Sequence, residues 1–412
     1  MNYQYYTLPN GIRVIHRYTD SSVAHCGIII NTGTRDETEQ ENGIAHFIEH
    51  VIFKGTKKRK AYHILSRLEN VGGDLNAYTT KEETCVYASF LDRYYDRTIE
   101  LIADIIFNSS FPDKEIEKEK DVVIDEINSY KDTPSEEIYD EFEEILFKNH
   151  PIGRNILGTP DDVKKISRET IKKFIDKNYF TDQMVISSVG KIDFKKLISI
   201  IEKYFGDFPA KNRLKKRAVF NDYKPSYRSV EKKTYLSHCC IGNIAFERKD
   251  KRKIPMVLLN NILGGPGLNS RLNLAVRERH GYTYTIESQY RSYSDTGIFC
   301  IYLGTDNDFL NKSISLVQKE LKILAEKKLG FLQLKRAKQQ LIGQLAIAYE
   351  SHLSEMLSIG KGYLHLNKVD TINEIYRKIE KVTSEELLEI ANEIFSPAQM
   401  SILIYQAKMN IE

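Results

Sequence analysis

Apolar and polar positions along the first half of the chain predict a mixed series of strands and helices. Asn10-Gly11 lies between two runs of alternating apolar residues, which predicts a β-hairpin over residues 7–15. Other strands are predicted where β-branched and aromatic residues gather, at residues 23–31, 75–80, 84–90 and 183–189. Helices are predicted where apolar residues recur every three or four positions, at residues 42–53, 61–71, 92–107 and 112–130, with later helices beginning at 134 and ending near 204.

The second half repeats this alternation. It begins with a strand-like stretch at residues 230–246 and ends with a strand at 400–405. Between them the pattern predicts helices at 254–263 and 270–280, strands at 282–290 and 297–303, and long helices from 309 onward. The fold class predicted from the whole pattern is α+β.

Two similar segments indicate a duplication. Ser167-Arg168-Glu169-Thr170 begins a helix that leads into an apolar strand, and Ser384-Glu385-Glu386 does the same about 215 residues later. Residues 208–217 are basic and contain a proline, and they lie at mid-chain. This charge run could bind an acidic partner, but a solvated linker is the favoured interpretation. We therefore predict a first domain at 1–210, a linker at 211–228 and a homologous domain at 229–412.

Composition narrows the possible partners and location. The 412 residues carry a net charge of only +3, so neither nucleic acid nor an anionic membrane is indicated as a partner. No basic and apolar leader begins the chain, and no run is long enough to cross a bilayer, so a cytoplasmic protein is expected. The five cysteines are scattered among apolar residues and are expected to be free core thiols.

The helix predicted at 42–53 carries chemistry that an ordinary core helix lacks. His46 and His50 are four residues apart, so both imidazoles can face one metal ion. Glu49 lies directly before His50, within reach of a water on that ion without being a ligand. The alternative is a helix with two core histidines that hydrogen-bond elsewhere. We favour the metal site because His-x-x-Glu-His is a known zinc-peptidase order.

A third ligand is expected on the charged helix predicted at 112–130. Glu119 and Glu126 are seven residues apart and share one helix face, and the intervening Val122 and Val123 are expected to bury that side. One carboxylate can complete a zinc site, while the other can hydrogen-bond a ligand imidazole and fix its tautomer. The spacing alone does not say which does which.

These motifs resemble those of the pitrilysin (inverzincin) family of zinc metallopeptidases, and in particular its short two-domain subunits similar to mitochondrial processing peptidase. The resemblance implies that His46, His50 and Glu126 bind one Zn²⁺ per subunit, while Glu119 assists catalysis. It also implies two homologous α/β-sandwich domains, each with an antiparallel-rich sheet and helices, and a clam-shell dimer.

The resemblance also assigns substrate contacts. Gly72-Gly73-Asp74-Leu75-Asn76-Ala77 matches the family's edge strand, where Asn76 and Ala77 are expected to bind extended peptide. In the second half, a glycine loop at 264–272 is followed by Arg277 and Tyr284, which match the family's substrate-carbonyl contacts. Without the family, the loop could equally be a helix-capping turn, and Arg277 an ordinary surface charge.

The function predicted from the sequence is zinc-dependent hydrolysis of peptides or unfolded segments inside a closed chamber. Glu49 is expected to take a proton from the zinc-activated water and pass it to the leaving amine. A homodimer is expected, and a heterodimer with a zinc-less homologue is the other possibility. The alternative functions are a non-catalytic scaffold and a peptide-binding subunit of the same fold.

Overall fold

The computed structural model describes residues 3–214 and 216–408. The chain forms two compact units, which are described separately. Unit one comprises Met1–Asn128, Arg154–Ala218 and Ile347–Thr371, and unit two comprises Ser129–Gly153, Val219–Ala346 and Ile372–Glu412. The ends of the predicted domains, at residues 1–2 and 409–412, and Lys215 of the predicted linker lie outside the described residues.

Unit one is built on a six-stranded sheet with the order β1-β2-β6-β3-β5-β4. Only the β2–β6 pair is parallel, and the other neighbours are antiparallel. The strands are β1 (Gln4–Thr7), β2 (Arg13–Tyr18), β3 (Val23–Ile30), β4 (Asp74–Thr79), β5 (Thr84–Leu91) and β6 (Met184–Gly190). The helices are α1 (Ile44–Val51), α2 (Ala61–Glu69), α3 (Tyr95–Asn108), α4 (Asp113–Lys131), α6 (Pro160–Lys165), α7 (Arg168–Asn178), α8 (Phe194–Phe205) and α12 (His352–Leu366).

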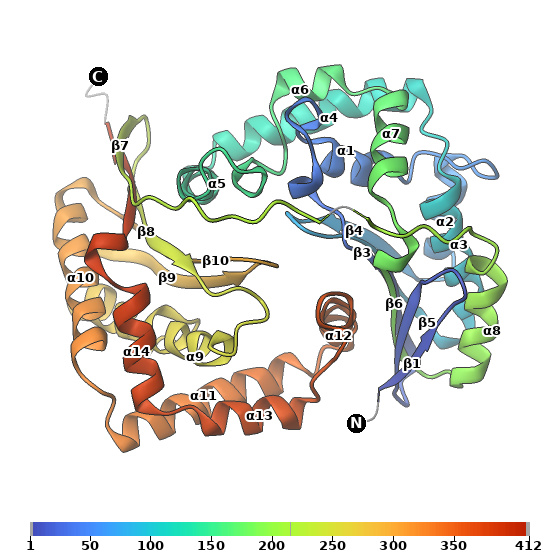
Figure 1. Ribbon diagram of the computed structural model, residues 1–412. Helices are drawn as coiled ribbons and strands as arrows, with labels where there is room; N and C mark the ends of the chain where they lie inside the picture. The colour runs from blue at the N-terminus through green and yellow to red at the C-terminus, as the bar shows by residue number, and fades with distance from the viewer. Residues whose placement is uncertain (1–2, 215, 409–412) are drawn as a thin grey trace. The chain divides into compact units, whose positions relative to one another are not determined.

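Both faces of this sheet are buried. Along β3, Ile28 and Ile30 contribute to the larger core under α1, α3, α7 and α8, whereas Ile29 contributes to a smaller core on the opposite face. Met356 and Ile359 of α12 fill that smaller core. Alternate side chains of a strand point to opposite faces, so a nearly continuous apolar strand is the expected sequence for a sheet covered on both sides. Figure 1 shows α12 beside β3 and β6.

Unit two is built on a five-stranded sheet with the order β7-β11-β8-β10-β9, in which only β7 and β11 are parallel. The strands are β7 (Tyr227–Lys232), β8 (Ser237–Ala245), β9 (Thr283–Ser292), β10 (Gly297–Thr305) and β11 (Ser401–Ala407). The helices are α5 (Pro134–Leu146), α9 (Lys253–Gly264), α10 (Leu310–Glu326), α11 (Phe331–Ala348), α13 (Ile372–Lys381) and α14 (Ser384–Ile394). The strand predicted at 230–246 is therefore two strands, β7 and β8.

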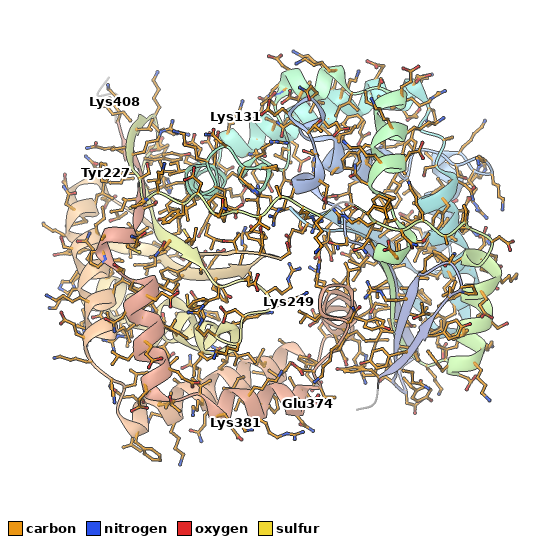
Figure 2. The ribbon with its side chains drawn as sticks, viewed as in Figure 1. Lys131, Tyr227, Lys249, Glu374, Lys381 and Lys408 are labelled. Carbon is orange, nitrogen blue, oxygen red and sulfur yellow. The ribbon has the colours of Figure 1, made fainter. Side chains whose placement is uncertain are left out.

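The sheet of unit two is also covered on both faces. Cys239 faces the core formed with α9, α10 and α14, and the adjacent Cys240 faces the core formed with α5. All five cysteines are buried and free, as predicted. At the β7 edge, Tyr227 is 69% exposed, and Lys408 forms an ion pair with Glu231 at 2.6 Å (Figure 2).

The two sheets share one topology, which confirms the predicted α+β class with two similar sheet-and-helix units. Strands β2, β6, β3, β5 and β4 correspond in order and direction to β7, β11, β8, β10 and β9, and β1 is an addition in unit one. The clam-shell dimer stays a prediction. Among the described residues, no helix combines the length and apolar character that a bilayer-spanning segment requires.

The units do not follow the two halves of the chain at two places. The segment 129–153, which contains α5, belongs to unit two, and the segment 347–371, which contains α12, belongs to unit one. The first half of the chain therefore contributes α5, which packs on β8 and β11 of unit two. The second half contributes α12, which packs on β3 and β6 of unit one. The domain boundaries at residues 210 and 229 stay a prediction. They do not include the exchange of segments 129–153 and 347–371.

The basic stretch near 213 is only partly a solvated linker. Arg213 forms an ion pair with Asp36, and Arg217 Nη2 lies 2.6 Å from Asp36 Oδ2. The Asp36 side chain is 3% exposed, and those of both arginines are mostly buried. The solvated interpretation is wrong for these two residues, because buried carboxylates of unit one bind them.

Candidate metal centre

Helix α1 begins at a glycine and is capped by a distant carboxylate. Gly43 has φ +83°, a conformation that L-residues with a side chain rarely adopt, and it has no side chain to cap the helix. Glu37 replaces that cap. Its Oε2 accepts a hydrogen bond from the Gly43 N–H at 3.0 Å, and its Oε1 accepts one from the Ala45 N–H at 2.8 Å. The carboxylate thus satisfies two backbone donors directly before His46.

Glu37 is buried, and its loop is held in turn by Arg154. Burial raises the pKa of Glu37 well above its usual value, although the hydrogen bonds from Ala45 and Gly43 oppose this effect. Arg154 Nη1 donates to the Glu37 carbonyl oxygen at 2.9 Å. The start of α1 is therefore fixed by contacts from several parts of unit one.

His46, His50 and Glu126 converge, as the family resemblance implies. One ligand atom from each of the three residues lies within 4.8 Å of the others. Glu126 Oε2 is 3.2 Å from His50 Nε2 and 3.8 Å from His46 Nε2. The two imidazole rings meet edge to face, with centroids 4.7 Å apart.

This donor set fits zinc. Two imidazoles and one carboxylate are the protein ligands of many catalytic zinc sites, where bonds of about 2.0–2.2 Å place ligand atoms about 3.3–3.5 Å apart. The separations from Glu126 are close to this value. Burial and the neighbouring His50 lower the pKa of His46 to about 3, so its imidazole is neutral at pH 7 and free to act as a ligand.

Glu119 contacts the other side of His50. Its Oε1 lies 3.1 Å from His50 Nδ1, and its Oε2 lies 2.7 Å from Lys54 Nζ. Burial raises the pKa of Glu119, but the hydrogen bonds from His50 and Lys54 outweigh it and bring the pKa below its usual value. An ionised Glu119 accepts the hydrogen of His50 Nδ1, so Nε2 is the nitrogen that faces Glu126 and that would be available to a metal ion.

Glu49 lies on α1 beside these residues but outside the cluster of three. The pKa of Glu49 lies above its usual value, chiefly because the carboxyl group is buried and also because of the charge of Glu126. Hydrogen bonds from Thr79 and the charge of His50 partly oppose this rise. Thr79, in β4, also donates a long hydrogen bond of 3.5 Å to the Ala45 carbonyl oxygen. A carboxylate with a raised pKa is suited to general base catalysis near neutral pH.

The face of α4 differs in one respect from the prediction. Glu119 and Val123 are buried, but Val122 is 49% exposed. Successive helix residues are rotated by about 100°, and on α4 this rotation turns Val122 toward solvent while Val123 points into the core. The expectation that Val122 buries this side is wrong.

Asn76 and Ala77 lie on β4, an edge strand. Within the described residues, β4 pairs only with β5, opposite Tyr87 and Val86. The other edge of β4 can therefore accept an added strand. Asn76 Nδ2 donates to Asp74 Oδ2 at 3.1 Å.

Arg277 and Tyr284 belong to unit two. Arg277 lies in a π-helical turn, Asn273–Glu278, and Tyr284 follows at the start of β9. The Arg277 guanidinium is 5.3 Å from the centre of the Tyr284 ring, and Tyr284 is 81% exposed. The structure thus brings these two side chains together, with the tyrosine available for contacts.

Three residues that contact this centre or helix α1 were not identified from the sequence: Glu37, Lys54 and Thr79. Lys54 lies just beyond the helix predicted at 42–53 and beyond the end of α1 at Val51, so helical spacing does not indicate it. Glu37 and Thr79 reach α1 through tertiary folding, and no local spacing indicates them.

Comparisons with known proteins identify the family. Residues 13–160 match the sequence model described as "Insulinase (Peptidase family M16)", and residues 165–341 match "Peptidase M16 inactive domain". The "Uncharacterized zinc protease YmxG" of Bacillus subtilis is 35% identical, with 95% of each chain covered. An "Uncharacterized zinc protease" of Streptomyces coelicolor is 31% identical over 94% of this chain and 86% of its own length.

Solved structures agree on the fold. A peptidase M16 inactive domain from Pseudomonas fluorescens superposes with a TM-score of 0.93 at 20% identity, covering 99% of this chain and 98% of that one. A protease from Helicobacter pylori superposes with a TM-score of 0.88 at 22% identity, covering 98% and 99%. The chain therefore belongs to peptidase family M16, the insulinase and pitrilysin-like family that its motifs resemble.

Proposed function

We propose that this protein is a zinc-dependent endopeptidase that hydrolyses peptides or unfolded segments. The observation that carries the proposal is the convergence of His46, His50 and Glu126, with Glu49 on the same helix. The relatives carry the name "uncharacterized zinc protease", which supports the proposal at the level of the family.

In the proposed site, His46, His50 and Glu126 hold one Zn²⁺ per subunit. When bound, zinc lowers the pKa of water to about 7 and polarises a carbonyl group. Glu49 accepts the proton of the water that attacks the peptide carbonyl carbon, and it delivers that proton to the leaving amine nitrogen as the C–N bond breaks. Glu119 holds His50 by its Nδ1.

Substrate binding is assigned to two segments. The free edge of β4, at Asn76 and Ala77, is proposed to pair with extended peptide, which selects unfolded segments because a folded helix or paired strand has no free backbone to offer. Arg277 and Tyr284 are proposed to donate hydrogen bonds to the substrate backbone or to the developing oxyanion. We further propose a homodimer in the cytoplasm, and a heterodimer with a zinc-less homologue is the alternative assembly.

The test is cleavage of an unstructured peptide with and without a chelator. The proposal predicts cleavage that is lost on chelation and restored by zinc. Glu49→Gln should bind zinc as the wild type does but lose most of the hydrolysis. A scaffold or a peptide-binding subunit would show no chelator-sensitive cleavage, and that result would replace the proposed function with one of these two.

A further inference from the structure

Lys54 lies at the outer end of a chain of polar contacts that reaches the metal centre. Its Nζ is 2.7 Å from Glu119 Oε2, Glu119 Oε1 is 3.1 Å from His50 Nδ1, and His50 Nε2 is 3.2 Å from Glu126 Oε2. The first two links join a hydrogen-bond donor to the Glu119 carboxylate, and the third joins two of the proposed metal ligands. The function proposed above uses every member of this chain except Lys54.

The two histidines are held in different ways. His50 has a carboxylate at Nδ1, whereas His46 Nδ1 is buried and has no hydrogen-bond partner among the described residues. Packing holds His46, which is 7% exposed. A ligand imidazole must keep one nitrogen free for the metal and direct it correctly, and a carboxylate on the other nitrogen does both. A hydrogen bond therefore orients the His50 ring, whereas packing orients the His46 ring.

The turn that carries Lys54 is fixed against the start of α4. Gly55 follows Lys54 with φ +158°, and a Cβ at Gly55 would lie 3.2 Å from Ser110 Oγ and 3.3 Å from Pro112 Cγ. The Ser110 N–H donates to the Gly55 carbonyl oxygen at 3.0 Å. Because α4 begins at Asp113, this contact sets the end of α1 against the helix that carries Glu119.

We propose that Lys54 is a positioning residue of the metal centre, whose ammonium group holds the Glu119 carboxylate against His50 Nδ1 and so directs His50 Nε2 toward the metal. The proposal rests on the proposed zinc site. The carboxylate has two oxygens to satisfy in a largely buried position, since the Glu119 side chain is 9% exposed. Lys54 satisfies one oxygen, which leaves the other on the imidazole. Without Lys54, Glu119 can rotate its buried oxygen toward water and away from His50.

Lys54→Met removes the charge while keeping an unbranched side chain of similar length. The dissociation constant for zinc is measured by competition with a chromogenic chelator, and the melting temperature of the zinc-free protein is measured in parallel. We expect zinc binding to weaken about tenfold, the lower end of the effect of outer-shell partners. Lys54→Arg should restore most of the affinity. The control is Lys58→Met, which removes the same charge from an exposed position and should leave affinity unchanged.

A double-variant cycle shows whether Lys54 acts through Glu119. Glu119→Gln alone should weaken zinc binding by about 10 to 100-fold. Adding Lys54→Met to that variant should cause little further loss, because the group that Lys54 positions is already changed. Independent effects of the two substitutions would overturn the proposal, and so would Lys54→Met with wild-type affinity. If Lys54→Met does not fold, Lys54→Gln takes its place in the cycle.

The outcome separates this proposal from the function on which it rests. If the wild type binds no zinc, the proposed function fails. If the wild type binds zinc and cleaves peptide but Lys54→Met does so equally well, only the role of Lys54 fails. In peptide cleavage by zinc-saturated protein, we expect Lys54→Met to lower kcat severalfold with little change in KM, since Lys54 does not contact substrate in the proposed site.

Discussion

Replacement of Glu83 by glutamine tests the two ion pairs through which this buried carboxylate holds α12 against the sheet of unit one. Glu83 lies in the turn between β4 and β5 and is 5% exposed. Its Oε1 is 2.7 Å from Lys361 Nζ, and its Oε2 is 3.0 Å from His365 Nε2. Both partners belong to α12, the helix that the second half of the chain contributes to this unit.

The pKa of Glu83 indicates the size of the effect. Burial raises this pKa, but the hydrogen bond from His365 and the charge of Lys361 outweigh burial and lower it from 4.5 to about 2. This lowering of the pKa corresponds to about 3 kcal/mol of folding free energy at pH 7. Since the pKa is lower in the folded state, the contribution is complete above pH 4.5 and is lost as the pH falls toward 2.

We expect Glu83→Gln to lower the free energy of unfolding by about 3 kcal/mol at pH 7, because it leaves Lys361 without its buried counter-charge. Urea unfolding followed by circular dichroism measures this, at pH 7 and at a series of lower values. The difference from wild type should shrink as the pH falls below about 4.5. Glu350→Gln is the control, since Glu350 is exposed and forms no ion pair within the described chain. A loss below about 1 kcal/mol at pH 7, or a difference that grows toward acid, would refute the reasoning.

Three further predictions test other parts of unit one. Burial is the largest cause that lowers the pKa of His16 from 6.5 to about 4. The free energy of unfolding of the wild type should therefore fall between pH 6.5 and pH 4, and this fall should exceed that of His16→Gln by up to about 3 kcal/mol. Urea unfolding measures both proteins, and the same dependence on pH in both would contradict this prediction. On α12, Gly360→Ala places a Cβ 2.5 Å from Ile29 Cδ1, whereas Gly362→Ala meets nothing closer than 3.5 Å. The first should lower the melting temperature, and the second should leave it unchanged or raise it, since alanine favours a helix over glycine by about 1 kcal/mol; equal effects would refute the close packing of α12. Glu37→Gln should cost about 1 to 2 kcal/mol and weaken zinc binding, because one backbone N–H at the start of α1 loses its acceptor; wild-type stability and zinc affinity would show that this cap is dispensable.

Much of the fold was predictable from the sequence because the apolar pattern is local. The β-branched run at residues 23–31 correctly predicted a strand, while the burial of both its faces, with Ile28 and Ile30 in one core and Ile29 in the other, was seen only in the structure. The exchange of α5 and α12 was not predictable. An amphipathic helix shows that it covers some apolar surface, but its spacing is the same whichever sheet it covers.

The candidate site was predictable to the extent that its members lie on regular helices. His46 and His50 are one turn apart on α1, and Glu119 and Glu126 are two turns apart on α4, so each pair shares a face for a reason visible in the sequence. Their meeting across two helices came from the family resemblance. Glu37 and Thr79 contact α1 through loops and sheet pairing, and Arg213 and Arg217 find a buried Asp36, which are tertiary effects without a local pattern.

The most direct test of the central claim is the zinc content of three purified proteins, the wild type, Glu49→Gln and Glu126→Gln, measured together with cleavage of an unstructured peptide. We predict one zinc ion per chain with activity in the wild type, the same zinc content with little activity in Glu49→Gln, and strongly reduced zinc in Glu126→Gln. A wild type without zinc, or equal zinc content in all three proteins, would contradict the claim that His46, His50 and Glu126 form the metal centre.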